Sequence, residues 1–142
     1  MGTVNLEAIT VTPLARIKTV GGDVMHALKQ HEAGFAGFGE AYFSFVSPGA
    51  VKAWKRHKRM IMNVVVPVGN VRFVFHLQGD DVYRVEDIGV DRYARITVPP
   101  GIWFGFQGLR ESQNLILNIA NIAHDPAEVD RLPTSEIKYS WS

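Results

Sequence analysis

Short apolar runs separated by turn residues recur along most of the chain. The runs are rich in Val, Ile, Phe and Tyr, and Gly, Pro, Asn or Asp residues lie between them. Runs of this kind at regular intervals are typical of β-strands in a sandwich or barrel. We therefore expect strands over residues 40–47, 51–58, 60–68, 71–78, 82–88, 93–98, 103–109 and 115–122.

The N-terminal part shows a weaker pattern. Residues 12–18 are expected to form a short edge strand, because Pro13 is tolerated only at an edge or at the start of a strand. Gly21 and Gly22 indicate a turn, and the alternation over residues 23–29 favours a further strand over a helical turn. The region before residue 40 therefore predicts strands at the edge of the fold.

The C-terminal part becomes polar from Asp125 onwards. An Asp at this position can cap a short helix, which we expect over residues 127–131, and residues 133–142 are expected to form a tail that docks. The Gly69-Asn70 pair predicts a two-residue hairpin. With about nine short strands, the whole chain, 1–142, is expected to be a single all-β domain of the jelly-roll kind.

Composition narrows the class of protein. The 142 residues are 46% hydrophobic and 20% charged, as in an ordinary globular domain. No run reaches the ~18 apolar residues of a membrane span, and the first residues lack a secretory signal pattern. The formal net charge of +1 argues against a nucleic-acid binder, and the absence of cysteine fits a reducing cytoplasm.

A cationic stretch interrupts the apolar pattern between Gly49 and Gly69. Because the net charge of the chain is small, this charge is local and suggests a site for a small anion; the alternative is a solvated strand edge. On a strand over 51–58, successive side chains point to opposite faces. One face would carry Val51, Ala53, Lys55 and His57, and the other Lys52, Trp54, Arg56 and Lys58, with Arg59 just beyond the strand.

The same stretch has the spacing of the first cupin metal signature: Gly, five residues, His-x-His, a short gap, Glu, six residues and Gly. Gly49, His57 and Gly69 match it. Lys55 occupies the place of the first histidine and Met62 that of the glutamate. Lysine at neutral pH is not an ordinary divalent-metal ligand, and the glutamate is lost, so no metal site is expected.

The second cupin signature, Pro-x-Gly-x-x-His, is matched by PPGIWF at residues 99–104, with Phe104 in place of the histidine. Extended to PPGIWFGF, the segment resembles the Pro-x-Gly-x-x-His-Gly-Phe passage of the dTDP-4-dehydrorhamnose 3,5-epimerases. EAYFS (40–44), PGAVKAW (48–54) and NIANIAHDPAE (118–128) are similar to further segments of that family, so the resemblance covers residues 11–133. It implies a cupin-type jelly-roll barrel, epimerisation without a cofactor, and a homodimer that exchanges an N-terminal strand.

The chain departs from that family at the positions of its catalytic and substrate-binding residues. The family's general-base histidine aligns with Lys55, its pocket histidine with Phe104, its acid tyrosine near Asn118 and its phosphate-binding arginine with Met25. In the related dTDP-sugar 3,4-ketoisomerases, the second histidine of Arg-Gly-x-His-Ala-His-Lys aligns with His57. The chain thus resembles a divergent member of the group.

Epimerisation next to a ketone needs a base, a group that stabilises the enolate, and an acid. Histidine titrates near neutral pH, so His57 is the candidate base, although a histidine at a strand end is often a surface residue. Lys55 is the second candidate catalytic residue, either as a charge for the enolate or as a base, unless it is simply a solvated lysine. The candidate substrate-binding residues are His26, Lys29, Glu40, Tyr42, Arg56, Trp103, Phe104 and Asn118.

These features lead to one main hypothesis and two alternatives. The main hypothesis is a metal-independent epimerase of a nucleotide-linked 4-keto-6-deoxy sugar, active in surface-polysaccharide biosynthesis. The alternatives are a 3,4-ketoisomerase-like enzyme and a cupin that binds a sugar nucleotide without catalysis. We expect a cytoplasmic homodimer with a nucleotide-sugar substrate, no cofactor, and no nucleic-acid or membrane partner.

Overall fold

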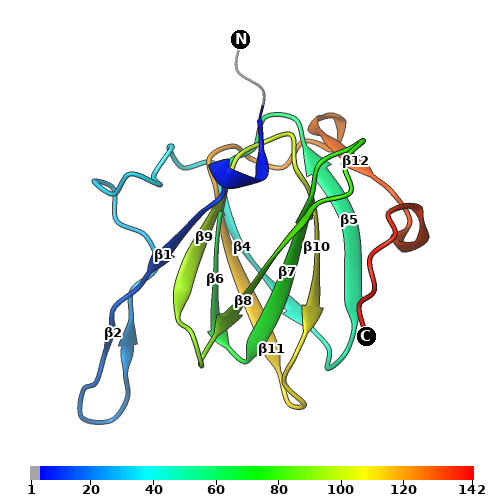
Figure 1. The fold of residues 1–142 in the computed structure, drawn as a ribbon. Helices are drawn as coiled ribbons and strands as arrows, with labels where there is room; N and C mark the ends of the chain where they lie inside the picture. The colour runs from blue at the N-terminus through cyan, green and yellow to red at the C-terminus, as the bar shows by residue number, and fades with distance from the viewer. Residues whose placement is uncertain (1–3) are drawn as a thin grey trace.

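Two antiparallel sheets of five strands face each other in the structure, a computed structural model that describes residues 4–142. One has the order β1-β9-β6-β11-β4 and the other β12-β5-β10-β7-β8 (Figure 1). All strands predicted between residues 40 and 122 are present. The bounds are β1 Thr10–Pro13, β4 Glu40–Val46, β5 Val51–His57, β6 Met62–Val68, β7 Asn70–His76, β8 Tyr83–Gly89, β9 Ala94–Val98, β10 Trp103–Gly108, β11 Asn114–Ala120 and β12 Val129–Arg131.

The remaining strands, β2 (Arg16–Ile17) and β3 (Val24–Met25), form a separate two-stranded hairpin. Figure 1 shows this hairpin projecting from the barrel. The predicted strand over 12–18 is split between the end of β1, which pairs with β9, and β2. Of the predicted strand over 23–29 only Val24–Met25 is a strand, because it pairs with β2 alone.

Most connections cross from one sheet to the other. Among the described strands, only the pairs β2–β3 and β7–β8 are neighbours both in sequence and in a sheet. The predicted hairpin at Gly69-Asn70 is therefore wrong, because β6 and β7 belong to different sheets. Gly69 has φ 81°, and a Cβ there would lie 2.3 Å from the carbonyl oxygen of Gln113. This corner needs glycine for close approach rather than for a hairpin turn.

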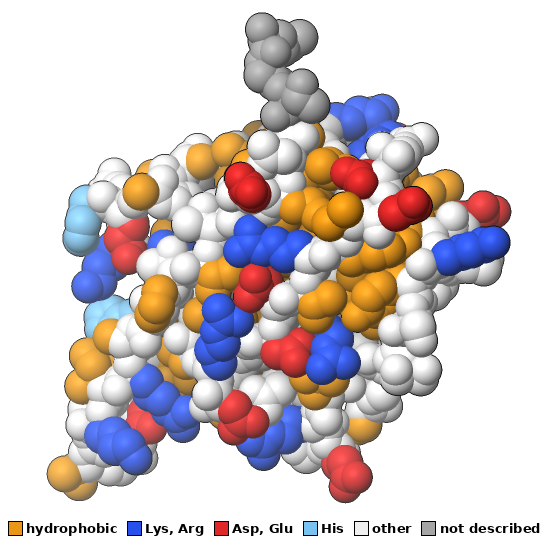
Figure 2. Space-filling view, viewed as in Figure 1, with side chains coloured by type: hydrophobic (Ala, Val, Ile, Leu, Met, Phe, Trp, Pro, Cys, Tyr) orange, Lys and Arg blue, Asp and Glu red, His pale blue; other side chains and the backbone are white. Residues whose placement is uncertain are grey.

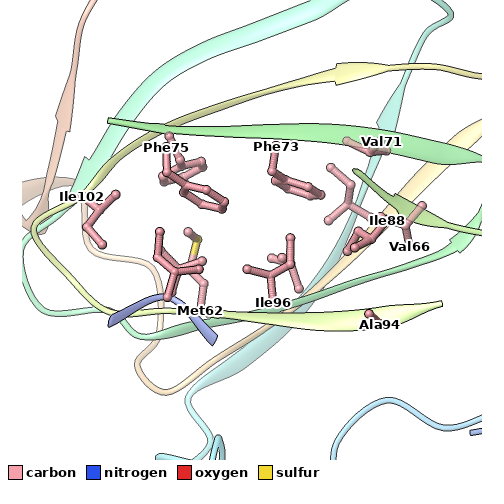
Figure 3. Close-up of a cluster of buried hydrophobic side chains, with 14 of the residues drawn as sticks. Met62, Val66, Val71, Phe73, Phe75, Ile88, Ala94, Ile96 and Ile102 are labelled. Atoms are coloured by element: carbon pink, nitrogen blue, oxygen red, sulfur yellow. The ribbon is translucent and has the colours of Figure 1, made fainter. Parts of the chain in front are cut away.

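The core fills the space between the two sheets. Figure 3 shows Phe73 and Phe75 of β7 pointing towards Met62 and Ile96 of the facing sheet. These side chains are buried, and each fully buried apolar side chain of this size contributes about 1.5–3 kcal/mol to stability. Apolar residues of both sheets fill the space between them and hold the two layers of the jelly roll together.

A short 3-10 turn, Leu6–Ala8, precedes β1 near the N-terminus. The C-terminal part contains two further 3-10 turns, Pro126–Glu128 and Thr134–Glu136, with β12 between them. Asp125 caps the turn Pro126–Glu128 by accepting a hydrogen bond from the backbone N–H of Ala127 at 3.0 Å, as predicted. The predicted helix over 127–131 is wrong, because β12 pairs with β5 instead. The predicted docking of the tail is confirmed by Ile137 and Trp141, which pack on the outer face of β5 and β10. No helix in residues 4–142 is long and apolar enough to cross a membrane.

Candidate active site

A bulge in β5 decides which side chains face the interior. The pairing of β5 with β10 shifts register where Gly105 lies opposite Ala53 and Phe104 lies opposite Lys55. Trp54 is the extra residue, so Ala53 and Trp54 both pack on the outer face. The predicted strict alternation over 51–58 is therefore wrong, although Lys55 and His57 do share a face.

The cavity lies between the sheets and encloses ≈ 600 Å³ of empty space, part of it open to solvent. Its floor is apolar and includes Met62, Val64, Phe106 and Ile116. Five of the predicted site residues line its walls: Tyr42, Lys55, His57, Phe104 and Asn118. His57 is buried and Lys55 is exposed, so His57 lies deeper in the cavity than Lys55.

His57 forms a buried pair with Glu128, which lies 71 residues later in the chain. Nδ1 of His57 faces Oε1 of Glu128, and the two side chains are 9% and 3% exposed. Oε2 of Glu128 accepts from three successive backbone N–H groups, at residues 58, 59 and 60, at 3.2, 3.0 and 3.1 Å. A charged carboxylate therefore fixes one edge of the imidazole, and Nε2 is the nitrogen left for the cavity.

Two opposing effects act on the pKa of Glu128. Burial works to raise the pKa of this carboxyl, whereas the hydrogen bonds from His57 and from the backbone N–H groups of Arg59 and Met60 lower it. The hydrogen bonds prevail and hold the pKa of Glu128 below its ordinary value. Glu128 is thus charged at neutral pH, and an adjacent carboxylate favours the Nδ1–H form of a histidine. The sequence predicted neither this residue nor its role.

Tyr42 and Asn118 lie on the wall opposite His57. They belong to β4 and β11 of one sheet, whereas His57 belongs to β5 of the other. Nδ2 of Asn118 donates to the hydroxyl oxygen of Tyr42 at 3.0 Å. Oδ1 of Asn118 is buried and finds no partner among the described residues. This wall therefore offers the Tyr42 phenol to a ligand, and Asn118 holds that phenol in place from behind.

Three cations gather at the cavity mouth. Lys52 lies opposite Phe106, a cavity residue, and Arg131 lies opposite Lys55. Partial desolvation against the cavity wall, followed by the positive charges of Arg131 and Lys52, lowers the pKa of Lys55, although the side chain still reaches solvent. Among residues 4–142 none of the three forms an ion pair with a carboxylate, so their charge is available to an anion.

The neighbouring cations are neutralised on the outer surface. Arg56 donates to Asp130 at 2.9 Å and its guanidinium lies 4.5 Å from the Trp103 ring centroid. Arg59 pairs with Asp125 at 3.2 Å. Arg56 and Trp103, both predicted to bind substrate, therefore lie outside this cavity, because both point outwards from their strands.

The other predicted contacts lie at or beyond the rim. Glu40 accepts from the backbone N–H of His124 at 2.6 Å, and His124 lines the cavity, a residue that the sequence did not single out. His26 and Lys29 lie beyond β3, outside the cavity walls. The structure of this one chain thus does not bring them to the site.

The residues present do not fit a metal. Lys55, Met62 and Phe104 hold three of the cupin ligand positions, and His57 alone keeps its histidine. No group of three or more His, Cys, Asp or Glu side chains in residues 4–142 is placed to hold a metal ion.

The chain is similar in structure and sequence to a dTDP sugar isomerase from Desulfovibrio desulfuricans G20. The two are 34% identical, with 95% of this chain and 91% of the other covered and a TM-score of 0.89. A probable low-salt glycan biosynthesis epimerase, Agl13 of Haloferax volcanii, is 27% identical over 101 residues, which span 66% of this chain and 65% of that relative's length.

The fold is also that of QdtA, a sugar 3,4-ketoisomerase from Thermoanaerobacterium thermosaccharolyticum solved in complex with TDP. Identity is 15%, 90% of each chain is covered and the TM-score is 0.76. No protein-family model matches the chain. The predicted cupin-type jelly roll is confirmed.

Proposed function

Because the chain belongs to the dTDP-sugar isomerase and epimerase family of cupin-fold enzymes, we propose that it epimerises a nucleotide-linked 4-keto-6-deoxy sugar without a metal or other cofactor. One observation carries the proposal. The His57–Glu128 pair lies on one wall of the cavity, and the Tyr42–Asn118 pair lies on the wall formed by the opposite sheet. A sugar ring between them would have a base on one face and an acid on the other.

The reaction begins when Nε2 of His57 takes the proton from the carbon next to the ketone. The C–H electrons move into the ring and the carbonyl oxygen becomes an enolate oxygen, which the charge of Lys55 stabilises. The Tyr42 hydroxyl then donates its proton to the same carbon from the opposite face, and the carbonyl re-forms. Configuration at that carbon is inverted, and the protons on His57 and Tyr42 exchange with solvent to reset the site.

Glu128 orients the base in this mechanism. It accepts the Nδ1–H proton of His57, which leaves the lone pair of Nε2 free for the substrate proton. Its own position is fixed by the three backbone N–H groups. A base whose protonation state and direction are preset contributes typically about 10²–10⁴-fold to the rate.

The test is incubation with dTDP-4-keto-6-deoxyglucose in D₂O, followed by mass spectrometry and NMR of the sugar. We expect deuterium at the carbon next to the ketone, and no deuterium with His57→Asn. The matched control is His31→Asn, since His31 is exposed and outside the cavity. Binding of the nucleotide without any exchange would instead support a non-catalytic sugar-nucleotide-binding cupin.

A second candidate is 3,4-ketoisomerisation. The observation that favours it is that His57, which aligns with the second histidine of the ketoisomerase motif, lines the cavity, although Lys55 replaces the first histidine. The same base would remove the C3 proton to give an enediolate, the proton of the C3 hydroxyl would pass to the C4 oxygen, and Tyr42 would protonate C4, so that the ketone moves to C3. NMR of the product separates the two reactions, because an epimerase leaves the ketone at C4.

The three free cations support a nucleotide diphosphate as the substrate's anchor. Lys52 and Arg131 lie further towards the mouth than His57, where a diphosphate would lie if the sugar reaches the base. Cations without acid partners are the groups that bind phosphate oxygens strongly. We therefore propose that Lys52 and Arg131 hold the diphosphate.

We also propose that the protein is a homodimer. Phe43 and Phe45 on the edge strand β4 are each 63% exposed, and Ile17 and Val24 on the projecting β2–β3 hairpin are 45% and 48% exposed. Exposed apolar side chains beside an unpaired strand edge are typical of an interface. We place the reaction in the cytoplasm, in the biosynthesis of a surface polysaccharide, in line with a sequence that contains no cysteine.

A further inference from the structure

The segment from Leu132 to Trp141 holds the β5 bulge from outside the barrel. Backbone hydrogen bonds link Trp54 N–H to the Leu132 oxygen at 3.0 Å and Leu132 N–H to the Trp54 oxygen at 3.1 Å. Nε1 of Trp54 donates to the Thr134 oxygen at 3.2 Å, and Oγ1 of Thr134 donates to the Ala53 oxygen at 3.2 Å. Both bulge residues are therefore tied to this one segment.

Aromatic packing covers the same point. Trp54 is 1% exposed, and its ring centroid lies 5.5 Å from that of Trp141. Beneath Trp141, a Cβ on Gly105 would lie 3.1 Å from the Trp141 ring and 2.5 Å from the Ala53 Cβ. Because position 105 is a glycine, the Trp141 ring can pack directly against the bulge.

The bulge determines which lysines face the cavity. In a regular strand counted back from His57, the inward residues would be 55, 53 and 51, and Lys52 would point outwards. The extra residue resets the alternation, so Lys52 lies opposite Phe106 and faces inwards with Lys55. The same C-terminal segment begins directly after Arg131, the third cation of the mouth.

We propose that Trp141 and Thr134 are positioning residues for the cationic mouth of the site. They do not touch the cavity; they hold the bulge in the register that turns Lys52 inwards beside Lys55 and Arg131. The role of the mouth as a diphosphate site rests on the proposed function, whereas the coupling between Trp141 and the lysines does not. The outer surface over β7 and β8 differs from this mouth: Figure 2 shows charges of both signs interspersed there, in line with the Arg72–Asp87 and Arg84–Glu86 pairs.

The experiment measures two quantities in wild type, Trp141→Ala, Trp141→Phe and the control Ser135→Ala, an exposed residue of the same segment. The first is the Kd for dTDP by calorimetry, which we expect to rise about tenfold in Trp141→Ala, the loss of one charge-assisted contact. The second is the NMR titration of the Lys55 Cε signal, assigned by its absence in Lys55→Arg. The pKa of Lys55 should move towards the ordinary lysine value, because a relaxed bulge lets water reach Lys55 and moves the charge of Lys52 away.

Trp141→Phe should restore most of both quantities, and Ser135→Ala should match wild type. If Trp141→Ala is too unstable, Thr134→Val removes one hydrogen bond to the bulge and should weaken dTDP binding about threefold. Unchanged Kd and unchanged Lys55 titration in a folded Trp141→Ala overturn the positioning role and leave the proposed function intact. A wild type that does not bind dTDP, with a Lys55 titration that still shifts in Trp141→Ala, overturns the nucleotide assignment and supports the positioning role.

Discussion

Replacing Glu128 with Gln keeps the shape of the side chain and removes its charge, which isolates the effect of the carboxylate on His57. A Gln amide has one accepting oxygen and one donating NH₂ group. The carboxylate faces three backbone N–H donors on one side and Nδ1 of His57 on the other. Turning the NH₂ towards the backbone would leave three donors without an acceptor, at about 1–3 kcal/mol each. The amide oxygen therefore stays on the backbone, and the NH₂ faces His57.

An NH₂ opposite Nδ1 forces that nitrogen to accept, so the imidazole proton moves to Nε2. Nε2 is the nitrogen left for the cavity, and once protonated it cannot take a proton from the substrate. We expect kcat of Glu128→Gln to fall by about 10²–10⁴, the usual contribution of a general base. KM should change little. The free energy of unfolding should fall by about 1.5–3 kcal/mol, because hydrogen bonds to a charged acceptor become neutral.

The pH dependence of stability follows from the same pair. Burial works to raise the pKa of Glu128, but the hydrogen bonds from His57 and the backbone hold it below 4.5. A carboxyl with a lowered folded-state pKa stabilises the protein fully above its unfolded pKa, and this contribution is lost as pH falls through the folded pKa. The stability gap between wild type and Glu128→Gln should be constant well above pH 4.5 and should shrink in acid.

The assay is kcat and KM by ion-exchange chromatography of the nucleotide sugars, with ¹⁵N NMR of the imidazole to read the tautomer. Glu136→Gln is the control, because that side chain is exposed and forms no ion pair within residues 4–142. A kcat of Glu128→Gln within about threefold of wild type, or an imidazole proton that stays on Nδ1, would refute the reasoning.

Three further substitutions test other parts of the site and surface. Tyr42→Phe should lower product formation about 10²-fold while deuterium exchange by mass spectrometry persists, because the base is intact; a parallel loss of exchange would show that Tyr42 is not the acid. Lys52→Ala should raise KM about tenfold, whereas Arg56→Ala removes an equal charge from the outer face and should leave KM unchanged; equal effects would place the diphosphate elsewhere. The double variant Phe43→Glu, Phe45→Glu should be a monomer by light scattering, and a monomeric wild type would contradict the homodimer.

Local pattern predicted the strands better than the connections between them. The strands between residues 40 and 122 are visible from their own side chains, because they are apolar runs bounded by turn residues. Burial alternates strictly along β11, whereas five successive residues of β6 are buried. Whether two successive strands share a sheet depends on what the connecting residues pack against. Gly69 packs against Gln113 and Asn114, which lie far along the chain. The Gly69-Asn70 dipeptide alone therefore predicted a hairpin at a position where the chain crosses between the sheets.

The candidate site was predictable only where it depends on spacing within one strand. Lys55 and His57 share a face because they are two residues apart on the same strand. Glu128 was missed because its partner is 71 residues away and its polar surroundings predicted a helix. The proton chemistry thus depends on β12 pairing with β5, a contact that no local pattern carries.

The same limit applies to charge. The sequence shows cations at 52, 55, 56, 58 and 59 as one basic stretch, and any of them is equally suited to a phosphate. Asp125 and Asp130, placed by the pairing of β12, neutralise the outer cations Arg56 and Arg59. The bulge turns Lys52 the other way, beside Lys55 and away from those acids. Strand register and distant carboxylates therefore decide which cations are available to a substrate. These cations are fewer than those of the basic stretch, and they lie at the cavity mouth rather than along the whole strand.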